Sequence, residues 1–309
     1  MFKILITGGA GFIGSHLANL LTKDLNFFIV SVDNFSSGKK DNLPLIPPNN
    51  YQFIECDVND YESLSHIMWS HQFDYVFHYA AVVGVQRTLE NPLMVLQDIE
   101  GIKNMLNLSK NSGVKRVFFS SSSEVYGEPV EFPQNEHTTP LNSKLPYAIV
   151  KNIGEAFLKS FKKEYDLDYT IFRFFNTYGS KQSPDFVISK FIKLAKENKD
   201  ITIYGDGLQT RTFCFIDDNL ETTVRILRDD LVVNDVINLG SDIELTILDL
   251  AKLVIEKTNS KSKIIHLPAL KEGDMTRRKP DNTKMKEILG RELLSLSNGL
   301  DKILELFHK

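Results

Sequence analysis

Three glycines at intervals of three residues stand between a short apolar run and an amphipathic stretch. Gly8, Gly11 and Gly14 follow the apolar residues 2–6, and in residues 13–21 the apolar side chains recur at helical spacing. Glycines in this pattern let a strand turn sharply into a helix and let the backbone approach a ligand closely. This unit constrains the fold more than any other feature, because it is typical of the start of a doubly wound α/β domain.

The first two-thirds of the chain repeats this alternation of short apolar runs and longer amphipathic stretches. Strands are predicted at residues 2–6, 28–32, 51–54, 75–78, 116–119 and 169–174, and helices at 13–21, 61–69, 92–109 and 146–165. Buried strands joined by crossover helices form a parallel sheet. The predicted fold class is therefore α/β, a Rossmann-like doubly wound parallel sheet with a smaller C-terminal substrate-binding lobe.

The pattern loosens beyond residue 176. Amphipathic segments at 184–197 and 246–257 alternate with loops rich in Gly, Asp and Arg, which predicts a second lobe. Asp217 and Asp218 could cap a helix that ends near residue 227, and residues 236–239 have the composition of a strand. We therefore expect a dinucleotide-binding domain at 1–175, to which about 214–240 return, and a mainly substrate-binding lobe at 176–309.

Composition argues against several classes of protein. The 309 residues suffice for a large core, and the formal net charge of -4 argues against a nucleic-acid binder with a broad basic surface. Cys56 and Cys214 lack the spacing of a zinc site or a disulfide framework, so we expect two buried free thiols and no metal. Without a signal-like segment or an apolar run of membrane-spanning length, the chain is expected to be a soluble cytoplasmic protein with no membrane partner.

An acidic residue ends the second predicted strand. Asp33 lies nineteen residues after Gly14, where a carboxylate can bond both hydroxyls of an adenosine ribose and would repel a 2′-phosphate. This favours NAD over NADP as the dinucleotide. Lys39 and Lys40 in the following loop leave a phosphate contact open, although lysines in a polar loop are more often only solvated.

Tyr147 and Lys151 are four residues apart in a predicted helix, so their side chains share one face. A lysine charge stabilises a phenolate, and a tyrosine whose pKa falls below its usual value of about 10 can take a hydroxyl proton near neutrality. The serines at 120–123 and Glu124 begin where the fifth strand is expected to end, at the carboxyl edge where such sheets place their sites. The pattern indicates oxidation of a hydroxyl group.

Together these motifs resemble the extended short-chain dehydrogenases of the NAD-dependent nucleotide-sugar epimerase and dehydratase family. The resemblance covers nearly the whole chain and rests on the glycine loop, residues 78–81, the segment 120–127 and the Tyr147/Lys151 pair. It implies that Tyr147 is the base, that Lys151 also holds the nicotinamide ribose, and that Ser122 bonds the sugar hydroxyl. This family usually has Asn at the position of Asp98, which here adds a carboxylate near the cofactor or the central helix.

The resemblance also implies the contacts of the cofactor. Besides Tyr147 and Lys151, the residues expected to contact NAD are Gly8, Gly11, Phe12, Ile13, Gly14, Asp33, Asn34, Ser37, Gly38, Asp57, Val58, Tyr79, Ala80, Ala81, Ser120 and Phe174.

A nucleotide sugar is the substrate that the resemblance implies. Its expected contacts are Val83, Gln86, Arg87, Ser122, Ser123, Glu124, Asn176, Val187, Lys190, Arg211, Arg277 and Arg278. The arginines suit diphosphate oxygens because guanidinium forks donate paired hydrogen bonds, although a single surface arginine more often makes an ordinary ion pair. Gln86 and Arg87, in the loop after the fourth strand, are candidates for sugar specificity.

Oxidation of the hexose at C4 to a 4-keto sugar is the step shared by the family, and its outcome is open in this sequence. We expect 4-epimerisation of a UDP- or GDP-sugar for surface polysaccharide precursors, with a net NAD-dependent 4-dehydrogenase of a sugar such as a GDP-heptose as runner-up. Glu124 leaves a 4,6-dehydratase or a UDP-glucuronate decarboxylase open. Residues 209–211 and 278–281 look most like decarboxylases, but residues 142–146 lack the arginine that those enzymes place there.

A non-catalytic dinucleotide-binding protein is the alternative from another class, and the intact Tyr147, Lys151 and Ser122 argue against it. The resemblance further implies a homodimer, in which the helices at 92–109 and 146–165 pair across the axis.

Overall fold

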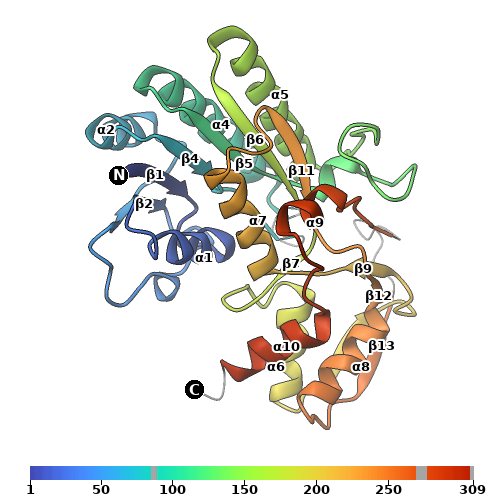
Figure 1. Cartoon of the computed structure of the whole chain (residues 1–309). Coiled ribbons are helices and arrows are strands. Elements are labelled where there is room, and N and C mark those ends of the chain that lie inside the picture. The colour runs from blue at the N-terminus through green and yellow to red at the C-terminus, as the bar shows by residue number, and fades with distance from the viewer. Residues whose placement is uncertain (85–87, 89, 269–276, 307–309) are drawn as a thin grey trace. The chain divides into compact units, whose positions relative to one another are not determined.

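A computed structural model describes residues 1–84, 88, 90–268 and 277–306 (Figure 1). The chain divides into two compact units, each assembled from three separate segments. Unit 1 comprises Met1–Gly127, Leu141–Arg173 and Thr223–Ile237, and unit 2 comprises Glu128–Pro140, Phe174–Thr222 and Asn238–Lys309.

A seven-stranded parallel sheet is the centre of the α/β architecture, with the strand order β11-β6-β5-β4-β1-β2-β3 (Figure 1). In β1, Leu5 lies opposite Val30 of β2 on one side and Val76 of β4 on the other. The predicted fold class is confirmed. The strands of the sheet are β1 Phe2–Thr7, β2 Phe27–Asp33, β3 Tyr51–Glu55, β4 Tyr75–His78, β5 Arg116–Ser122, β6 Asp168–Phe174 and β11 Asp235–Leu239.

Helices connect these strands, and local signals set their ends. Asp60 caps α2 by accepting the backbone N–H groups of Glu62 and Ser63, while α4 and α5 each begin with a proline, which needs no hydrogen-bond acceptor there. Gly113, at a φ of 78°, ends α4 in the left-handed region that favours glycine. The helices are α1 Phe12–Leu21, α2 Tyr61–His71, α4 Pro92–Ser112, α5 Pro146–Tyr165 and α7 Ile216–Arg228.

One apolar core joins α2, α4 and α5 to the sheet. Leu64 of α2, Met105 of α4 and Leu158 of α5 are buried in the same cluster as Val76 and Val117 of the strands. Area removed from water by such a cluster is the main term that stabilises a domain of this size. Packing against these helices therefore fixes the positions of the carboxyl ends of β4 and β5.

Unit 2 contains short strand pairs and helices. Strand β9 (Thr210–Thr212) pairs with β12 (Glu244–Thr246), β7 (Thr177–Tyr178) with β10 (Cys214–Phe215), and β8 (Ile201–Tyr204) with β13 (Ile264–Leu267). Its remaining helices are α6 Val187–Lys196, α8 Ile247–Lys257, α9 Thr283–Leu289 and α10 Leu296–Glu305. Thr246 caps α8 and Ser295 caps α10 through their hydroxyl oxygens.

Two boundaries differ from those expected from the sequence. Strand β5 continues to Ser122, beyond the predicted end at residue 119, because the small hydroxyl side chains fit a buried strand and Ser121 finds a buried hydrogen-bond acceptor. Asp217 and Asp218 lie inside the first turn of α7 rather than before it. Carboxylates there interact favourably with the positive end of the helix dipole.

Cys56 and Cys214 are both buried free thiols, as expected. Within the described ranges, no helix has the length and apolar character needed to cross a membrane.

Candidate active site

In the glycine loop, backbone segments pack so closely that there is no room for side chains at Gly8 and Gly14. A Cβ on Gly14 would lie 2.3 Å from the carbonyl oxygen of Gly8, and a Cβ on Gly8 would lie 2.8 Å from the backbone nitrogen of Ala80. Gly8 has a φ of 68°, and the N–H of Gly11 donates to its carbonyl at 3.0 Å. Helix α1 begins just after Gly11, so its first N–H groups suit a phosphate group next to this loop.

Asp33 ends β2 beside the glycine loop. Its carboxylate accepts the N–H of Ala10 at 3.0 Å and the N–H of Phe35 at 2.8 Å, which fixes its orientation. Burial raises the pKa of Asp33, and the two backbone bonds act against that rise. A Cβ on Gly38 would meet the Asp33 carboxylate at 2.7 Å, so the loop after β2 closes over this residue.

The neighbouring loops extend the same edge of the sheet. The amide of Asn34 donates to Asp57 at 3.0 Å, and Val58 packs against α4 at Gly101. Ser37 is exposed in the loop after β2. Asn42, a residue that sequence reasoning missed, donates its side-chain amide to the carbonyl of Ala10 at 2.7 Å.

Thr7 joins the carboxyl ends of β1 and β4. Its hydroxyl oxygen accepts the N–H groups of Tyr79 and Ala80, each at 3.0 Å, and lies 3.0 Å from Nδ1 of His78. Burial, with a smaller effect of the Lys151 charge, lowers the pKa of His78 to about 3. The ring is therefore neutral. Because the Thr7 oxygen already accepts two N–H groups, its own proton is left to donate to Nδ1 of His78. Ala81 and Val83 continue this loop and are half-buried.

Lys151 is almost completely buried on α5, on the same face as Tyr147. Its Nζ lies 3.5 Å from the hydroxyl of Ser120, 5.0 Å from the centroid of the Phe119 ring and 5.7 Å from that of Tyr147. Burial lowers the pKa of Lys151 to about 8, and the charge of Asp98 opposes this change. A charged ammonium group next to a half-buried phenol stabilises the phenolate form.

The serine run brings Ser122 and Glu124 to the end of β5. Ser122 caps the short helix η2 (Ser123–Tyr126), and its hydroxyl oxygen accepts the N–H of Glu124 at 3.2 Å. Ser122 and Ser123 are buried, while the Glu124 side chain is half-buried. Because this bond uses only an acceptor lone pair, the Ser122 hydroxyl also has a proton that it can donate.

Beneath the serine run lies a buried ion pair that the sequence did not reveal. Arg173 donates from Nε and Nη2 to the two carboxylate oxygens of Glu155, and from Nη1 to the phenol oxygen of Tyr126 at 2.9 Å. Ser121 donates to the same carboxylate at 2.6 Å. The ion pair therefore holds the segment that contains Ser122 at two points, Ser121 before it and Tyr126 after it.

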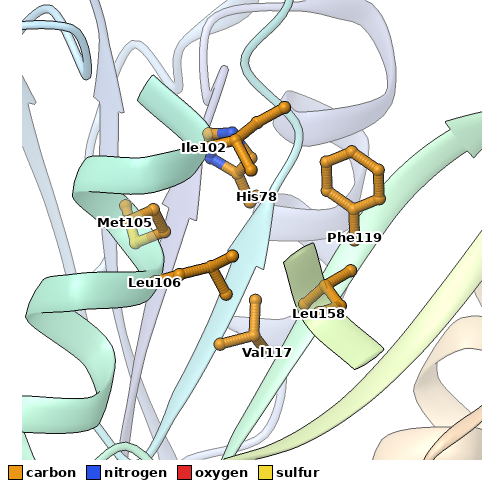
Figure 2. A pocket seen from close by; sticks show the side chains of 7 residues that line it. All are labelled: His78, Ile102, Met105, Leu106, Val117, Phe119 and Leu158. Atoms are coloured by element: carbon orange, nitrogen blue, oxygen red, sulfur yellow. The ribbon is translucent and has the colours of Figure 1, made fainter. Parts of the chain in front are cut away.

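A narrow apolar cavity lies between His78 and the face of α4 that packs on the sheet (Figure 2). The side chains around it come from β4, α4, β5 and α5, and the space between them is too narrow for a water molecule. Its lining residues are His78, Ile102, Met105, Leu106, Val117, Phe119 and Leu158. On the neighbouring side, a Cβ on Gly154 would meet the Phe119 ring at 2.4 Å, so α5 packs directly against β5. This packing fixes Lys151 relative to Ser120.

The candidate residues in unit 1 fit a dinucleotide. Three features lie along one edge of the sheet: the glycine loop, the oriented carboxylate of Asp33 and the buried ammonium group of Lys151. The glycine loop leaves space for a phosphate group that a Cβ at residue 8 or 14 would fill. In the described part of the chain, no three His, Cys, Asp or Glu side chains group in a way that could hold a metal ion.

In unit 2, the three candidate arginines have different surroundings. Arg277 binds Glu244 with two bonds of 2.6 and 2.7 Å and lies over the ring of Phe132. Arg211 stands in β9 and donates to the carbonyl of Thr210, whereas Arg278 is buried.

The remaining candidates of unit 2 lie around its short strands. Asn176 donates to the carbonyl of Thr212 at 2.9 Å and so links β9 to the segment after β6. Val187 begins α6 and Lys190 lies one turn later, both half-buried, as is Phe174. Gln86 and Arg87 fall outside the described residues.

Comparisons with known proteins agree on one family. A model of the NAD dependent epimerase/dehydratase family matches residues 4–240. The UDP-N-acetyl-alpha-D-glucosaminuronate decarboxylase of Bacillus cytotoxicus is 35% identical, over 99% of this chain and 98% of its own. The UDP-glucose 4-epimerase of Thermotoga maritima, solved with UDP-glucose, is 35% identical with a TM-score of 0.93 and covers 99% of both chains.

A third relative has a different reaction. The dTDP-glucose 4,6-dehydratase of Streptomyces venezuelae, solved with NAD bound, is 26% identical with a TM-score of 0.90, over 99% of this chain and 97% of its own. The decarboxylase, the epimerase and the dehydratase thus resemble this chain along nearly its whole length.

Proposed function

Since the chain belongs to the NAD dependent epimerase/dehydratase family, whose cofactor is NAD, we propose that it oxidises C4 of a nucleotide-linked hexose and then epimerises that carbon. NAD held by the glycine loop and Asp33 would supply a hydride acceptor for C4 and then a hydride donor to the opposite face of that carbon. Lys151 stabilises Tyr147 as a phenolate, which takes the C4 hydroxyl proton and becomes a neutral phenol, while Ser122 donates a hydrogen bond to the sugar oxygen.

The observation that carries the C4 oxidation is the buried ammonium group beside the phenol. Lys151 stands one turn from Tyr147, and its Nζ is within 3.5 Å of Ser120 in a dry part of the sheet edge. In such surroundings a charge acts more strongly on its neighbours than in water. This arrangement supports a tyrosine base that works near neutral pH.

Unit 1 would hold the dinucleotide through the glycine loop, Asp33, Tyr147 and Lys151. Unit 2 would hold the nucleotide diphosphate, with Arg211 and Arg278 as the phosphate ligands and Asn176 as a contact of the sugar nucleotide. Paired N–H donors of arginine suit phosphate oxygens. The likeness to the Thermotoga maritima UDP-glucose 4-epimerase supports a UDP-sugar and the epimerase outcome.

Decarboxylation of a nucleotide-linked uronic acid is the second candidate. It is favoured by Glu124 next to Ser123, and by the decarboxylase of Bacillus cytotoxicus, which matches this chain as fully as the epimerase does. A 4-keto group weakens the bond to a carboxylate at C5, because the electrons left by carbon dioxide are delocalised into the ketone. Oxidation by the same Tyr147 and Lys151 would therefore serve both outcomes.

The test is to incubate the purified protein and NAD with UDP-, GDP- and dTDP-sugars, including uronic acids, and to follow product mass and reduced nicotinamide. An isomer of unchanged mass without lasting NADH supports epimerisation, and loss of carbon dioxide supports the second candidate. Loss of two hydrogens with stoichiometric NADH, or loss of water, would replace both proposals by a dehydrogenase or a dehydratase. Tyr147→Phe is the control, and turnover equal to the wild type would reject the assignment of the base.

A further inference from the structure

Asp98 brings a carboxylate to the loop that follows β4. It lies on α4, is half-buried, and accepts the backbone N–H of Val82 through Oδ2 at 2.7 Å. Val82 comes directly after Tyr79, Ala80 and Ala81 at the carboxyl end of the strand. The bond fixes the carboxylate at the same sheet edge as the glycine loop.

The charged groups around Asp98 come from several elements. Lys151 of α5 interacts with it electrostatically, and so does Asp57, which follows β3. Tyr147 lies on the same face of α5 as Lys151, Ser120 of β5 contacts the ammonium group, and His78 of β4 is neutral. Burial raises the pKa of Asp98, while its bond to Val82 and the Lys151 charge oppose that rise. These two contacts stabilise the ionised form of the carboxylate.

We propose that Asp98 is a fixed negative charge that makes this site prefer NAD⁺ over NADH. The inference rests on the proposed function, in which Lys151 helps to hold the dinucleotide beside the carbon that is oxidised. The nicotinamide ring then lies near Lys151, and the charge of Asp98, which interacts with Lys151, also acts on that ring. That ring is positive in NAD⁺ and neutral in NADH. A nearby carboxylate therefore stabilises the oxidised cofactor and leaves the reduced cofactor almost unaffected.

The preference has a direct consequence for the reaction. A site that binds the oxidised cofactor more tightly makes return of the hydride to the keto sugar more favourable. The cofactor then stays oxidised between turnovers, as a reaction without net redox change requires. An Asn at residue 98 would keep the bond to Val82 but would lose this bias.

The experiment compares the wild-type chain with Asp98→Asn, which retains an oxygen acceptor for the Val82 N–H and removes the charge. The affinity for NADH is measured by its fluorescence in cofactor-stripped protein, and that for NAD⁺ by competition. We expect the ratio of Kd for NADH to Kd for NAD⁺ to fall about three- to tenfold. The matched control, Glu100→Gln, removes an exposed carboxylate two residues away on α4 and should leave the ratio unchanged.

An unchanged ratio in Asp98→Asn would overturn the proposal, as would an equal fall in Glu100→Gln. If Asp98→Asn does not fold, Asp98→Ser keeps a hydroxyl oxygen without charge and must shift the ratio in the same direction. The measurement needs no sugar. Failure of every sugar to turn over would thus count against the proposed function alone, and an unchanged ratio in a chain that does turn over would count against Asp98 alone.

Discussion

Arg173 donates two hydrogen bonds, of 2.9 and 2.7 Å, to the two carboxylate oxygens of Glu155, and both side chains are 2% exposed. The carboxylate also accepts from Ser121, and the guanidinium also donates to Tyr126. Ser122 and Glu124 stand between those two contacts in the chain. The ion pair therefore positions the residues proposed to meet the sugar, although both of its own partners are buried.

Breaking this pair is expected to be costly. Glu155→Gln leaves the Arg173 charge buried without a compensating anion, so we expect a loss of about 3–5 kcal/mol in the free energy of unfolding. Chemical denaturation followed by circular dichroism measures it. The control is Asp166→Asn, which removes an exposed ion pair with Lys162 and should cost less than about 1 kcal/mol. Equal losses in the two variants would contradict a supporting role for the buried pair.

Lys151→Met should make the cofactor-free protein more stable at neutral pH. The pKa of Lys151 is about 8 in the folded chain and 10.5 without the fold, so the unfolded state binds more protons between these values. Stability of the wild type therefore carries the full cost of the buried charge below pH 8 and recovers it as pH rises towards 10.5. We expect a gain on the order of 3 kcal/mol at pH 7.

The pH dependence distinguishes this effect from ordinary packing. In Lys151→Met the advantage over the wild type should shrink steadily in unfolding measurements from pH 8 to pH 10. Lys103→Met, which replaces an exposed lysine on α4, should show no such trend. A gain that is independent of pH would argue against the lowered pKa as its cause.

The glycine loop predicts a loss of cofactor binding in Gly14→Ala. The new methyl group would lie 2.3 Å from the Gly8 carbonyl oxygen, so the loop must open and can no longer follow the pyrophosphate. Calorimetry should detect no binding of NAD at concentrations that saturate the wild type. Gly113→Ala is the control, since its φ of 78° brings backbone strain but nothing lies within 4 Å of the new Cβ. That variant should lose about 1 kcal/mol of stability and keep its affinity for NAD.

Glu124→Gln separates the two proposed reactions. If Glu124 takes part in decarboxylation, its loss should lower kcat by about 100-fold or more, whereas 4-epimerisation should change by less than about tenfold. Initial rates on the substrate identified by product mass give the answer. Glu128→Gln, an exposed neighbour, should retain wild-type rates. A 100-fold loss of epimerisation would mean that Glu124 also acts in the shared oxidation.

A homodimer formed through α4 and α5 is a further expectation. Leu93 of α4 is 77% exposed, and Ile149 of α5 is 38% exposed, so the two helices present apolar side chains outside their own core. Leu93→Glu should shift the protein towards monomers in sedimentation equilibrium. Leu25→Glu, at a residue 78% exposed after α1, should not. A monomeric wild type at working concentrations would remove the prediction.

Local spacing explains why the central features of unit 1 were predictable. The glycine loop and the Tyr147/Lys151 pair depend on neighbours within one turn, so the order of residues alone indicates their geometry. Asp33 follows from its place at the end of a strand. The strand and helix types in the sheet were predicted for the same reason, although β5 continues further than its apolar residues indicated.

Long-range partners were not predictable in this way. His78 is neutral because it is buried, and its hydrogen-bond partner Thr7 is 71 residues away, while Arg116 of β5 donates to the hydroxyl oxygen of Thr170 on β6. In unit 2, β9 and β12 are three residues each, too short for a period of two to stand out from the surrounding loops. The ion pair between Arg277 and Glu244 also joins residues that are 33 positions apart, so local spacing in the sequence does not predict it.

The alternation of the two units along the chain restricts how new specificities can arise. The segments of unit 1 and unit 2 follow each other in turn, so no single cut separates one unit from the other. A crossover between two relatives at residue 174 would exchange most of unit 2 but also residues 223–237 of unit 1. A single crossover between two relatives therefore cannot exchange one whole unit and leave the other intact. Changes of substrate have to be made by point substitution or by grafting single segments, and library design should follow the same route.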